Sequence, residues 1–536
     1  MHISKNLTHL GIVSGVCKKI GLVEEIDCIV GVDSRQKVTC GQAVVAMVLN
    51  ALGFVDRPLY LFPEFLETKP VELLIGPGFI SEDFNDDVLG RTLDKLSVAG
   101  LEETFMRVAA SAQTYAGDDD RFFHSDTTSM SVHGEYDHDD DDEPVPIQIT
   151  YGYPKDHRAD LKQFVISLVT SKGLPVFIQG LSGNTSDKDH FRELPEMYGM
   201  MLRKTWGTDR IWVWDSAFYT KKNLQALPPD MVWITRVPET LTLAQKLLQN
   251  AENMTATSMK GYSIQSTTVT SAGVQQRWIV VLSKQAYARE EKTLEKKIQQ
   301  EKEQVKKTLW HLSHQEFQCR EDGLSALHEL SKKWKYHRIQ KVDLVEKQQK
   351  KNGGKGRPKT GDMKMTFYLV TATAQENDVE IHRCLQSLGR FIVATKELNA
   401  EKLSDEDTVK AYKDQQQVER GFRFLKDPLF FAHAIFLKTE RRIQAMVMIM
   451  GLALLIYAIA EKKLRDALKT MDETLPDQKG KPTKTPTMRR MFQTFEGVSV
   501  IYNEQGELLE VMNLSETSRK VLLLFGEEYM EAYGLK

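Results

Sequence analysis

The stretch RIWVWDSAFYT, residues 210–220, contains an unbroken apolar run from Ile211 to Trp214 that ends in Asp215. A continuous apolar strand is typical of a parallel sheet that is covered on both faces. In open α/β sheets, ligands bind beyond the carboxyl ends of the strands, and Asp215 stands at such an end. The stretch therefore predicts an α/β fold with a functional carboxylate at one edge of its sheet.

A second carboxylate lies upstream in RFFHSDTTSMSV, residues 121–132. Its phenylalanines and β-branched threonines favour a strand, and Asp126 lies inside that strand. His124 falls on the same side of the strand, two residues before Asp126. We expect Asp126 to be functional, whereas His124 either orients it or is a structural histidine.

A third carboxylate belongs to a helical pattern in AYKDQQQVERGFRFLKDP, residues 411–428. Residues spaced by three or four share one face of a helix. That face carries Tyr412, Gln415, Glu419, Arg423 and Lys426. A helix face that packs in a core would be apolar, so this polar face indicates a functional role. A carboxylate beside cations suits a site that holds a metal ion next to a phosphate backbone.

Three carboxylates on separate elements can converge on a pair of divalent cations. Hard cations such as Mg²⁺ prefer oxygen ligands. Two such ions about 3.5–4 Å apart can clamp the attacking and leaving oxygens of a phosphodiester. The pattern predicts metal-assisted phosphoryl transfer at Asp126, Asp215 and Glu419.

Seven blocks in this order resemble the DDE transposases of bacterial insertion sequences: HSDTT, YGYPKDHRADLKQ, GNTSD, WVWDSAFYT, WITRVP, GRFIVATKEL and YKDQQQVERGFRFLKDP. The likeness is to the insertion-sequence-four type, marked by a Tyr-Arg-Glu-Lys motif, and to its long-chain relatives. It implies that Asp126, Asp215 and Glu419 form a catalytic triad for two Mg²⁺ ions, which Mn²⁺ can replace. It also implies that Tyr412 and Lys426 contact phosphates of the transposon end.

One position departs from the family motif, because Gln415 stands where the motif has arginine. Glutamine can hydrogen-bond a phosphate oxygen but carries no charge, and Arg420 and Arg423 are nearby cations that can take over this contact. The resemblance further implies cut-and-paste transposition of DNA by a homodimer in a synaptic complex. In that reaction an end is nicked, and the freed 3′ hydroxyl attacks the opposite strand by a hairpin route and later the target.

The fold class that follows is α/β, with a ribonuclease-H-like catalytic core interrupted by an insertion domain and preceded by a helical domain. The expected segments are 1–115 (helical, possibly binding DNA ends), 120–237 (first part of the core), 238–365 (insertion domain with strands, charged helices and a basic loop), 366–465 (second part of the core) and 466–536 (linker, hairpin and short helix). The expected core strands are 122–132, 147–153, 175–181, 211–214 and 231–237.

Two segments carry charge of a single sign. The acidic burst at 137–143 is either a solvated loop or, with His133 and His138, a loop that attracts metal. The stretch 347–360 has six Lys or Arg residues and no acid, and it reads as a flexible basic loop. Such a loop either neutralises DNA phosphates or is a solvated linker.

Composition narrows the class of protein. The chain has 536 residues, 41% apolar content, a formal net charge of −3 and five scattered cysteines with no CxxC pair. This spacing argues against a disulfide framework or zinc site and fits a reducing cytoplasm, with no secretory leader expected. The apolar run at 445–460 is shorter than the roughly 20 residues of a membrane span, so it predicts a buried helix.

Rival interpretations remain open at this point. An apolar strand followed by Asp215 also occurs in phosphotransferases that form an aspartyl phosphate, and the chain could instead be a catalytically inactive, transposase-derived DNA-binding protein. Asp160 and Asp187 are interpreted as helix or turn caps. Three tryptophans are either core residues or platforms for a flipped base: Trp233, Trp278 and Trp310.

Overall fold

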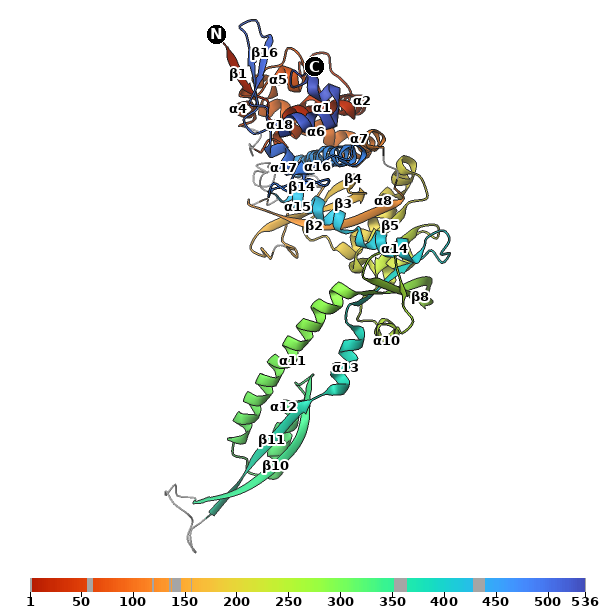
Figure 1. Ribbon diagram of the computed structural model, residues 1–536, viewed down its shortest axis with the longest axis vertical. Helices are drawn as coiled ribbons and strands as arrows, with labels where there is room; N and C mark the ends of the chain where they lie inside the picture. Colours follow the sequence, from red (N-terminus) through yellow and green to blue (C-terminus); the bar gives the residue numbers. More distant parts are fainter. Residues whose placement is uncertain are drawn as a thin grey trace, which may run out of the picture. The chain divides into compact units, whose positions relative to one another are not determined.

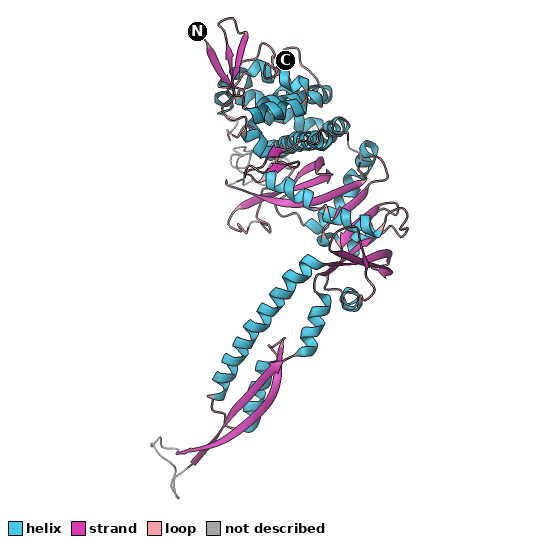
Figure 2. Ribbon diagram, in the orientation of Figure 1, coloured by secondary structure: helices cyan, strands magenta, loops and turns pink. Residues whose placement is uncertain are grey.

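The computed structural model describes residues 2–54, 61–117, 120–134, 136, 146–155, 157–350, 364–427 and 439–535. They form two compact units (Figure 1). Unit 1 comprises Met1–Thr235, Ser271–Val274 and Lys410–Lys536, and unit 2 comprises Arg236–Thr270 and Gln275–Val409. Both units mix helices and strands, so the fold is α/β as expected (Figure 2).

The sheet of unit 1 has the strand order β4-β3-β2-β5-β6. The strands are β2 (Phe122–Val132), β3 (Lys162–Ser171), β4 (Leu174–Leu181), β5 (Ile211–Trp214) and β6 (Val232–Arg236). β2, β3 and β4 pair antiparallel, whereas β5 pairs parallel to β2, and β6 parallel to β5. The predicted strands at 122–132 and 211–214 are confirmed. The strand at 175–181 begins one residue earlier, and the strand at 231–237 is one residue shorter at each end.

The expected strand at 147–153 is wrong. This segment contributes a single bridge, between Thr150 and Gln163, and the second strand of the sheet is β3 instead. A Cβ on Gly152 would lie 2.0 Å from the carbonyl oxygen of Gly183. The segment is therefore held against the GNTSD loop, and Pro154, which has no N–H to donate to a ladder, follows at once.

The helix α16 (Glu440–Thr470) lies in the interior of unit 1. It packs on β4 and on three helices of the N-terminal segment, α3 (Cys40–Ala51), α6 (Asp86–Ala99) and α7 (Leu101–Ala116). A helix that is apolar on all sides is normally buried on all sides. Among the described residues α16 alone is long and apolar enough to cross a membrane, yet 83% of its apolar window is buried inside the protein.

The remaining helices of unit 1 are α1 (Leu10–Lys19), α2 (Leu22–Val30), α4 (Phe62–Glu67), α5 (Val71–Leu74), α8 (Asp187–Trp206), α9 (Lys221–Ala226), α15 (Gln416–Leu425), α17 (Met488–Gln493), α18 (Glu516–Phe525) and α19 (Glu527–Glu531). A second sheet joins β1 (Ile3–Asn6) to the hairpin of β15 (Ser499–Tyr502) and β16 (Leu508–Met512). A short ladder connects β13 (Leu475–Pro476) and β14 (Pro482–Thr483). A strand near the start of the chain and a hairpin near its end therefore belong to one sheet of unit 1.

Unit 2 contains the strand order β12-β9-β8-β7 and a separate hairpin. These strands are β7 (Thr255–Ala256), β8 (Tyr262–Ser271), β9 (Val274–Ser283) and β12 (Arg390–Thr395), and the hairpin strands are β10 (His337–Lys350) and β11 (Lys364–Glu376). The helices of this part of the chain are α10 (Thr242–Asn250), α11 (Lys284–Ser313), α12 (Arg320–Ser331), α13 (Asp378–Ser387) and α14 (Asp405–Lys413), whose last residues belong to unit 1.

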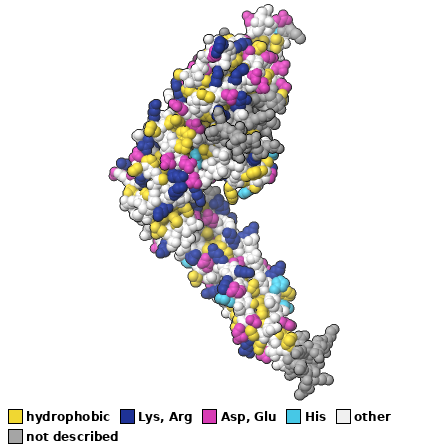
Figure 3. All heavy atoms as spheres, turned by 180° about the vertical axis from the view of Figure 1, so that it is seen from behind, with side chains coloured by type: hydrophobic (Ala, Val, Ile, Leu, Met, Phe, Trp, Pro, Cys, Tyr) yellow, Lys and Arg dark blue, Asp and Glu magenta, His cyan; other side chains and the backbone are white. Residues whose placement is uncertain are grey.

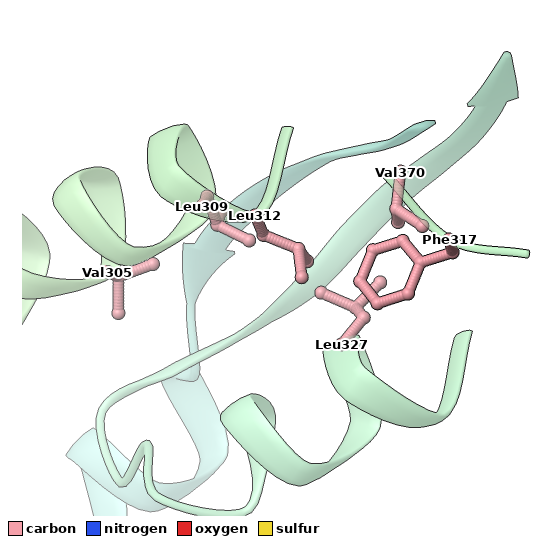
Figure 4. Packing of buried hydrophobic residues seen from close by; sticks show 6 residues of the cluster. All are labelled: Val305, Leu309, Leu312, Phe317, Leu327 and Val370. Atoms are coloured by element: carbon pink, nitrogen blue, oxygen red, sulfur yellow. The ribbon is translucent and has the colours of Figure 1, made fainter. Parts of the chain in front are cut away.

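The hairpin packs on α11 and α12 around a small core of its own (Figure 4). The core consists of Val305, Leu309, Leu312, Phe317, Leu327 and Val370. Charged helices were expected within residues 238–365, and α11 is one of them; its apolar residues Val305, Leu309 and Leu312 belong to this core. The acidic burst at 137–143 and most of the basic loop at 347–360 lie outside the described residues.

Candidate active site

Asp126 and Asp215 come together because their strands are parallel neighbours. The β2–β5 ladder runs from Phe122 opposite Ile211 to His124 opposite Val213. Continued by two residues beyond the ladder, this register brings Asp126 opposite Asp215, and the charge of Asp215 acts on Asp126. Opposite residues of a parallel pair point to the same side of the sheet, so the two carboxylates are adjacent.

Both carboxyl groups are held in a setting that disfavours their charge. The pKa of Asp126 is raised to about 7: burial raises it most, the nearby acids Asp215 and Asp187 also raise it, and Lys155 and the Thr127 N–H lower it. Burial also raises the pKa of Asp215, although the backbone N–H of Ala217 donates to its Oδ1 at 2.9 Å. A cation bound to these oxygens would restore the charged form.

Lys155 and Asp187 form an ion pair that completes this part of the site. The Lys155 ammonium lies 3.2 Å from Asp187 Oδ2 and 3.9 Å from Asp126 Oδ1, and it donates to the Thr127 carbonyl at 2.5 Å. The Thr127 hydroxyl in turn donates to Asp187 Oδ1, and the Thr127 N–H donates to Asp126 Oδ1 at 2.7 Å. The structure thus groups the carboxylates of Asp126, Asp187 and Asp215 around one lysine.

Asp187 was expected to be a cap, but the N-cap of α8 is Ser186, and the Asp187 carboxylate is directed to Thr127 and Lys155. Sequence reasoning missed both Lys155 and Asp187 as members of the site. The signal was present, since both residues fall in blocks that carry the family resemblance, YGYPKDHRADLKQ and GNTSD. Asp160 does not join them, because it is exposed and paired with Arg158 at 2.7 Å.

Glu419 belongs to α15, a helix that packs beside the strand of Asp126. Its helix α15 packs on β2 and β3, and a Cβ on Gly421 would lie 2.9 Å from Leu168, the residue opposite Asp126 on β3. The Glu419 side chain is nevertheless exposed. Within the described ranges no three or more His, Cys, Asp or Glu side chains are arranged to hold a metal ion.

The helix expected to run through residues 412–426 is broken. α14 ends at Lys413, and α15 begins at Gln416 after a turn. Gln415 lies in this turn, is 9% exposed, and donates its amide to the carbonyl of Ser125 at 2.9 Å. This glutamine therefore joins the helix to β2, next to Asp126.

The predicted DNA-contact residues differ in exposure. Arg420 and Arg423 are exposed, and Tyr412 and Lys426 are half-buried. At about 100° per residue, position 419 of α15 and position 426, the residue that caps its C-terminus, lie on one flank of the helix, beside the apolar face that packs on the sheet. The face drawn in Figure 3 shows Lys and Arg side chains interspersed with Asp and Glu, in keeping with the net charge of −3.

His124 is a structural residue in this arrangement. Its Nε2 lies 2.8 Å from the carbonyl oxygen of Ala411, and burial lowers its pKa. The neutral ring therefore donates Nε2–H to that carbonyl and ties α14 to β2. Of the tryptophans, Trp233 and Trp278 are fully buried core residues, whereas Trp310 is 59% exposed.

Comparison with known protein families identifies the family of this chain. The family described as Transposase DDE domain matches residues 119–456, more than half of the chain. The chain belongs to this family. Residues 2–110 of the DDE-family chain match a domain of unknown function, DUF4277. The expected kinship with DDE transposases is confirmed, and the Tyr-Arg-Glu-Lys subgroup stays a prediction.

Other comparisons add little to the DDE-family assignment. A search of curated proteins gave no match. A solved piggyBac transposase synaptic complex with hairpin DNA aligns over 92% of this chain and 82% of its own, with 9% identity and a TM-score of 0.34. A TM-score this low supports no structural inference.

The residues of the site fit a divalent cation in part. Asp126 and Asp215 offer hard carboxylate oxygens, and burial raises the pKa of both, so a bound cation would favour their ionised forms. Glu419 lies on α15, which packs on β2 and β3, and its side chain is exposed. The described residues thus offer a pair of carboxylates, and no group of three among them is arranged to hold a metal ion.

Proposed function

We propose that this DDE-family chain is a metal-dependent DNA transposase that moves an insertion sequence by cut-and-paste. The proposal rests mainly on Asp126 and Asp215, two adjacent, half-buried carboxylates, one on β2 and one at the end of the parallel strand β5, each with a raised pKa. Such a pair is stabilised when a divalent cation binds to it. The strand order β4-β3-β2-β5-β6, antiparallel and then parallel, supports a ribonuclease-H-like core around the pair.

The proposed ligands are Asp126, Asp215 and Glu419, and the ions are two Mg²⁺, with Mn²⁺ as a substitute. When bound, these ions would supply Lewis acidity at the phosphodiester and favour the deprotonated attacking hydroxyl. Asp126 and Asp215 would bind through their carboxylate oxygens. Glu419 would join them from α15, whose packing on β2 and β3 keeps it close.

The cations of α15 would position the DNA. Arg420 and Arg423 are exposed on the same short helix as Glu419, so phosphates bound there lie beside the carboxylates. Tyr412 and Lys426, at the two ends of the segment, would contact further phosphates. Gln415 is a packing residue in this proposal, because its amide is engaged by Ser125.

The reaction consists of successive phosphoryl transfers. Water attacks a phosphodiester at the transposon end and releases a 3′ hydroxyl. This hydroxyl then attacks the opposite strand, giving a hairpin, and after resolution attacks the target DNA. The protein contributes positioning and charge stabilisation and forms no covalent intermediate with DNA. We propose a homodimeric synaptic complex that acts on DNA in the bacterial cytoplasm.

The test uses labelled DNA that carries the ends of the element encoding the chain. Asp126→Ala, Asp215→Ala and Glu419→Ala should each abolish nicking in Mg²⁺ while end binding in a gel-shift assay persists. Asp189→Ala is the matched control, because Asp189 is an exposed acid on α8 that pairs with Arg192 away from the cluster. Nicking at the normal rate by one of the three variants would remove that residue from the site.

The same assay separates the rival functions. An inactive DNA-binding protein would bind ends and never nick them in Mg²⁺ or Mn²⁺. A phosphotransferase would trap labelled phosphate on Asp215, and the label would be lost in Asp215→Ala. Neither result is expected.

A further inference from the structure

Lys155 is the cation closest to the carboxylates of the candidate site. Its ammonium lies 3.2 Å from Asp187 Oδ2 and 3.9 Å from Asp126 Oδ1, and it donates to the backbone carbonyl of Thr127. Its charge favours the ionised form of Asp126 and of Asp215. Lys155 therefore supplies part of the positive charge that a divalent cation would supply.

The Lys155 side chain is accessible to solvent, into which its ammonium can move. Its side chain is 39% exposed, and it approaches the cluster from a loop rather than from the sheet. The Asp126 side chain is 18% exposed, so the carboxylate stays behind when the lysine swings into water. The contacts of Lys155 are thus of the kind that a competing cation can replace.

Asp187 determines where Lys155 sits. One of its oxygens accepts from the Thr127 hydroxyl, and the other faces the ammonium. Asp187 begins α8, so its backbone is fixed by a helix of twenty residues. Asp187 can therefore hold the lysine beside Asp126 without being a ligand of the metal ion itself.

We propose that Lys155 is a displaceable counter-ion of the Asp126–Asp215 pair, positioned by Asp187, and that this Lys155–Asp187 pair sets the divalent-cation concentration at which the site fills. The inference rests on the proposed function, because it assumes that the cation binds at Asp126 and Asp215. A cation entering there must displace the ammonium or bear its repulsion. Either cost weakens binding, so the site does not fill at low concentrations of metal.

The first experiment measures Mn²⁺ binding to the full chain without DNA, by the loss of the free-ion electron paramagnetic resonance signal at pH 8. Replacing Lys155 with methionine, which keeps the length of the side chain, should lower the Mn²⁺ dissociation constant about tenfold, because charges about 4 Å apart at a partly exposed site interact on that scale. Lys155→Arg keeps the charge and should bind Mn²⁺ like the wild type.

Lys222→Met is the matched control. Lys222 lies 3.5 Å from Asp189, outside the cluster, and removing it changes the net charge of the chain equally. Its dissociation constant should equal that of the wild type. Unfolding temperatures measured in chelator verify that each variant is folded, and Lys155→Gln replaces the methionine variant if the latter is not.

A double-mutant cycle tests the role of Asp187. If Asp187 acts by holding Lys155, then Asp187→Asn changes Mn²⁺ affinity in the wild type but not in the Lys155→Met background. If Asp187 is itself a ligand, the loss of affinity is the same in both backgrounds. That second outcome would overturn the assignment of Asp187 as a positioning residue.

Two failures are distinguishable. If the wild type and Asp126→Asn bind Mn²⁺ equally, the metal site of the proposed function is wrong. If Asp126→Asn loses binding but Lys155→Met binds no more tightly than the wild type, only the counter-ion proposal falls. Unchanged metal affinity with reduced DNA cleavage in Lys155→Met would assign the lysine to the DNA phosphate instead.

Discussion

Replacing Asp126 with asparagine should stabilise the metal-free protein, and the gain should grow with pH. The Asp126 pKa is about 7 in the folded chain, against an ordinary value of 3.8. A group whose folded pKa is raised contributes stability that is present below its unfolded pKa and is lost as pH rises through its folded pKa. The wild type therefore loses stability between about pH 4 and pH 7, and the Asn variant does not.

The size of the effect follows from the two pKa values. Each tenfold change in an ionisation constant corresponds to about 1.4 kcal/mol, so full ionisation of Asp126 costs the fold about 4 kcal/mol. Part of that cost is already present at pH 5, which leaves about 2–3 kcal/mol for the interval from pH 5 to pH 8. The Asp126 side chain is 18% exposed, so solvent screening makes these figures upper values.

The assay is chemical unfolding of the wild type and of Asp126→Asn at pH 5, 6, 7 and 8 in chelator. The difference in unfolding free energy should widen by about 2–3 kcal/mol in favour of the variant. Millimolar Mg²⁺ or Mn²⁺ should then stabilise the wild type alone, because only an ionised pair binds the cation. A difference that is constant from pH 5 to pH 8 would refute the burial and repulsion assigned to Asp126.

Three further predictions concern packing, and urea unfolding measures all of them. Gly183→Ala should destabilise unit 1 by about 1–3 kcal/mol, since a Cβ there would lie 2.0 Å from the Gln163 carbonyl oxygen; an unchanged midpoint would contradict this geometry. Leu327→Ala, in the hairpin core, should lower the free energy of unfolding by about 2–5 kcal/mol. Leu324→Ala, at a residue 43% exposed on the same helix, should lower it little, and equal losses in the two variants would be inconsistent with that core. Gln415→Ala should cost about 1–3 kcal/mol by leaving the Ser125 carbonyl without its donor, and the exposed Gln416→Ala should be neutral.

Local patterns were sufficient to predict the strands that carry Asp126 and Asp215. Both strands have short-range signals, aromatic and β-branched residues in one and an unbroken apolar run in the other, and both have the predicted bounds. The buried helix α16 was predictable for the same reason, because its apolar composition is continuous.

The missed features depend on tertiary contacts. β3 was overlooked in favour of residues 147–153, whose apolar alternation is similar but whose Gly152 is pressed against Gly183. The break between α14 and α15 has no proline or glycine to announce it, and Gln415 turns inward there to bond β2. The pairing of Lys155 with Asp187 joins residues thirty-two positions apart, which spacing along a helix or strand cannot reveal.

The position of α16 also has a consequence for biosynthesis. The N-terminal helices pack on a segment that begins at residue 440, whereas α7 ends at residue 116. At about 5–20 residues per second, the ribosome adds the intervening chain in roughly 15–65 seconds. During that interval the apolar faces of α3, α6 and α7 have no partner to cover them, so nascent chains stalled before residue 440 should recruit chaperones or aggregate.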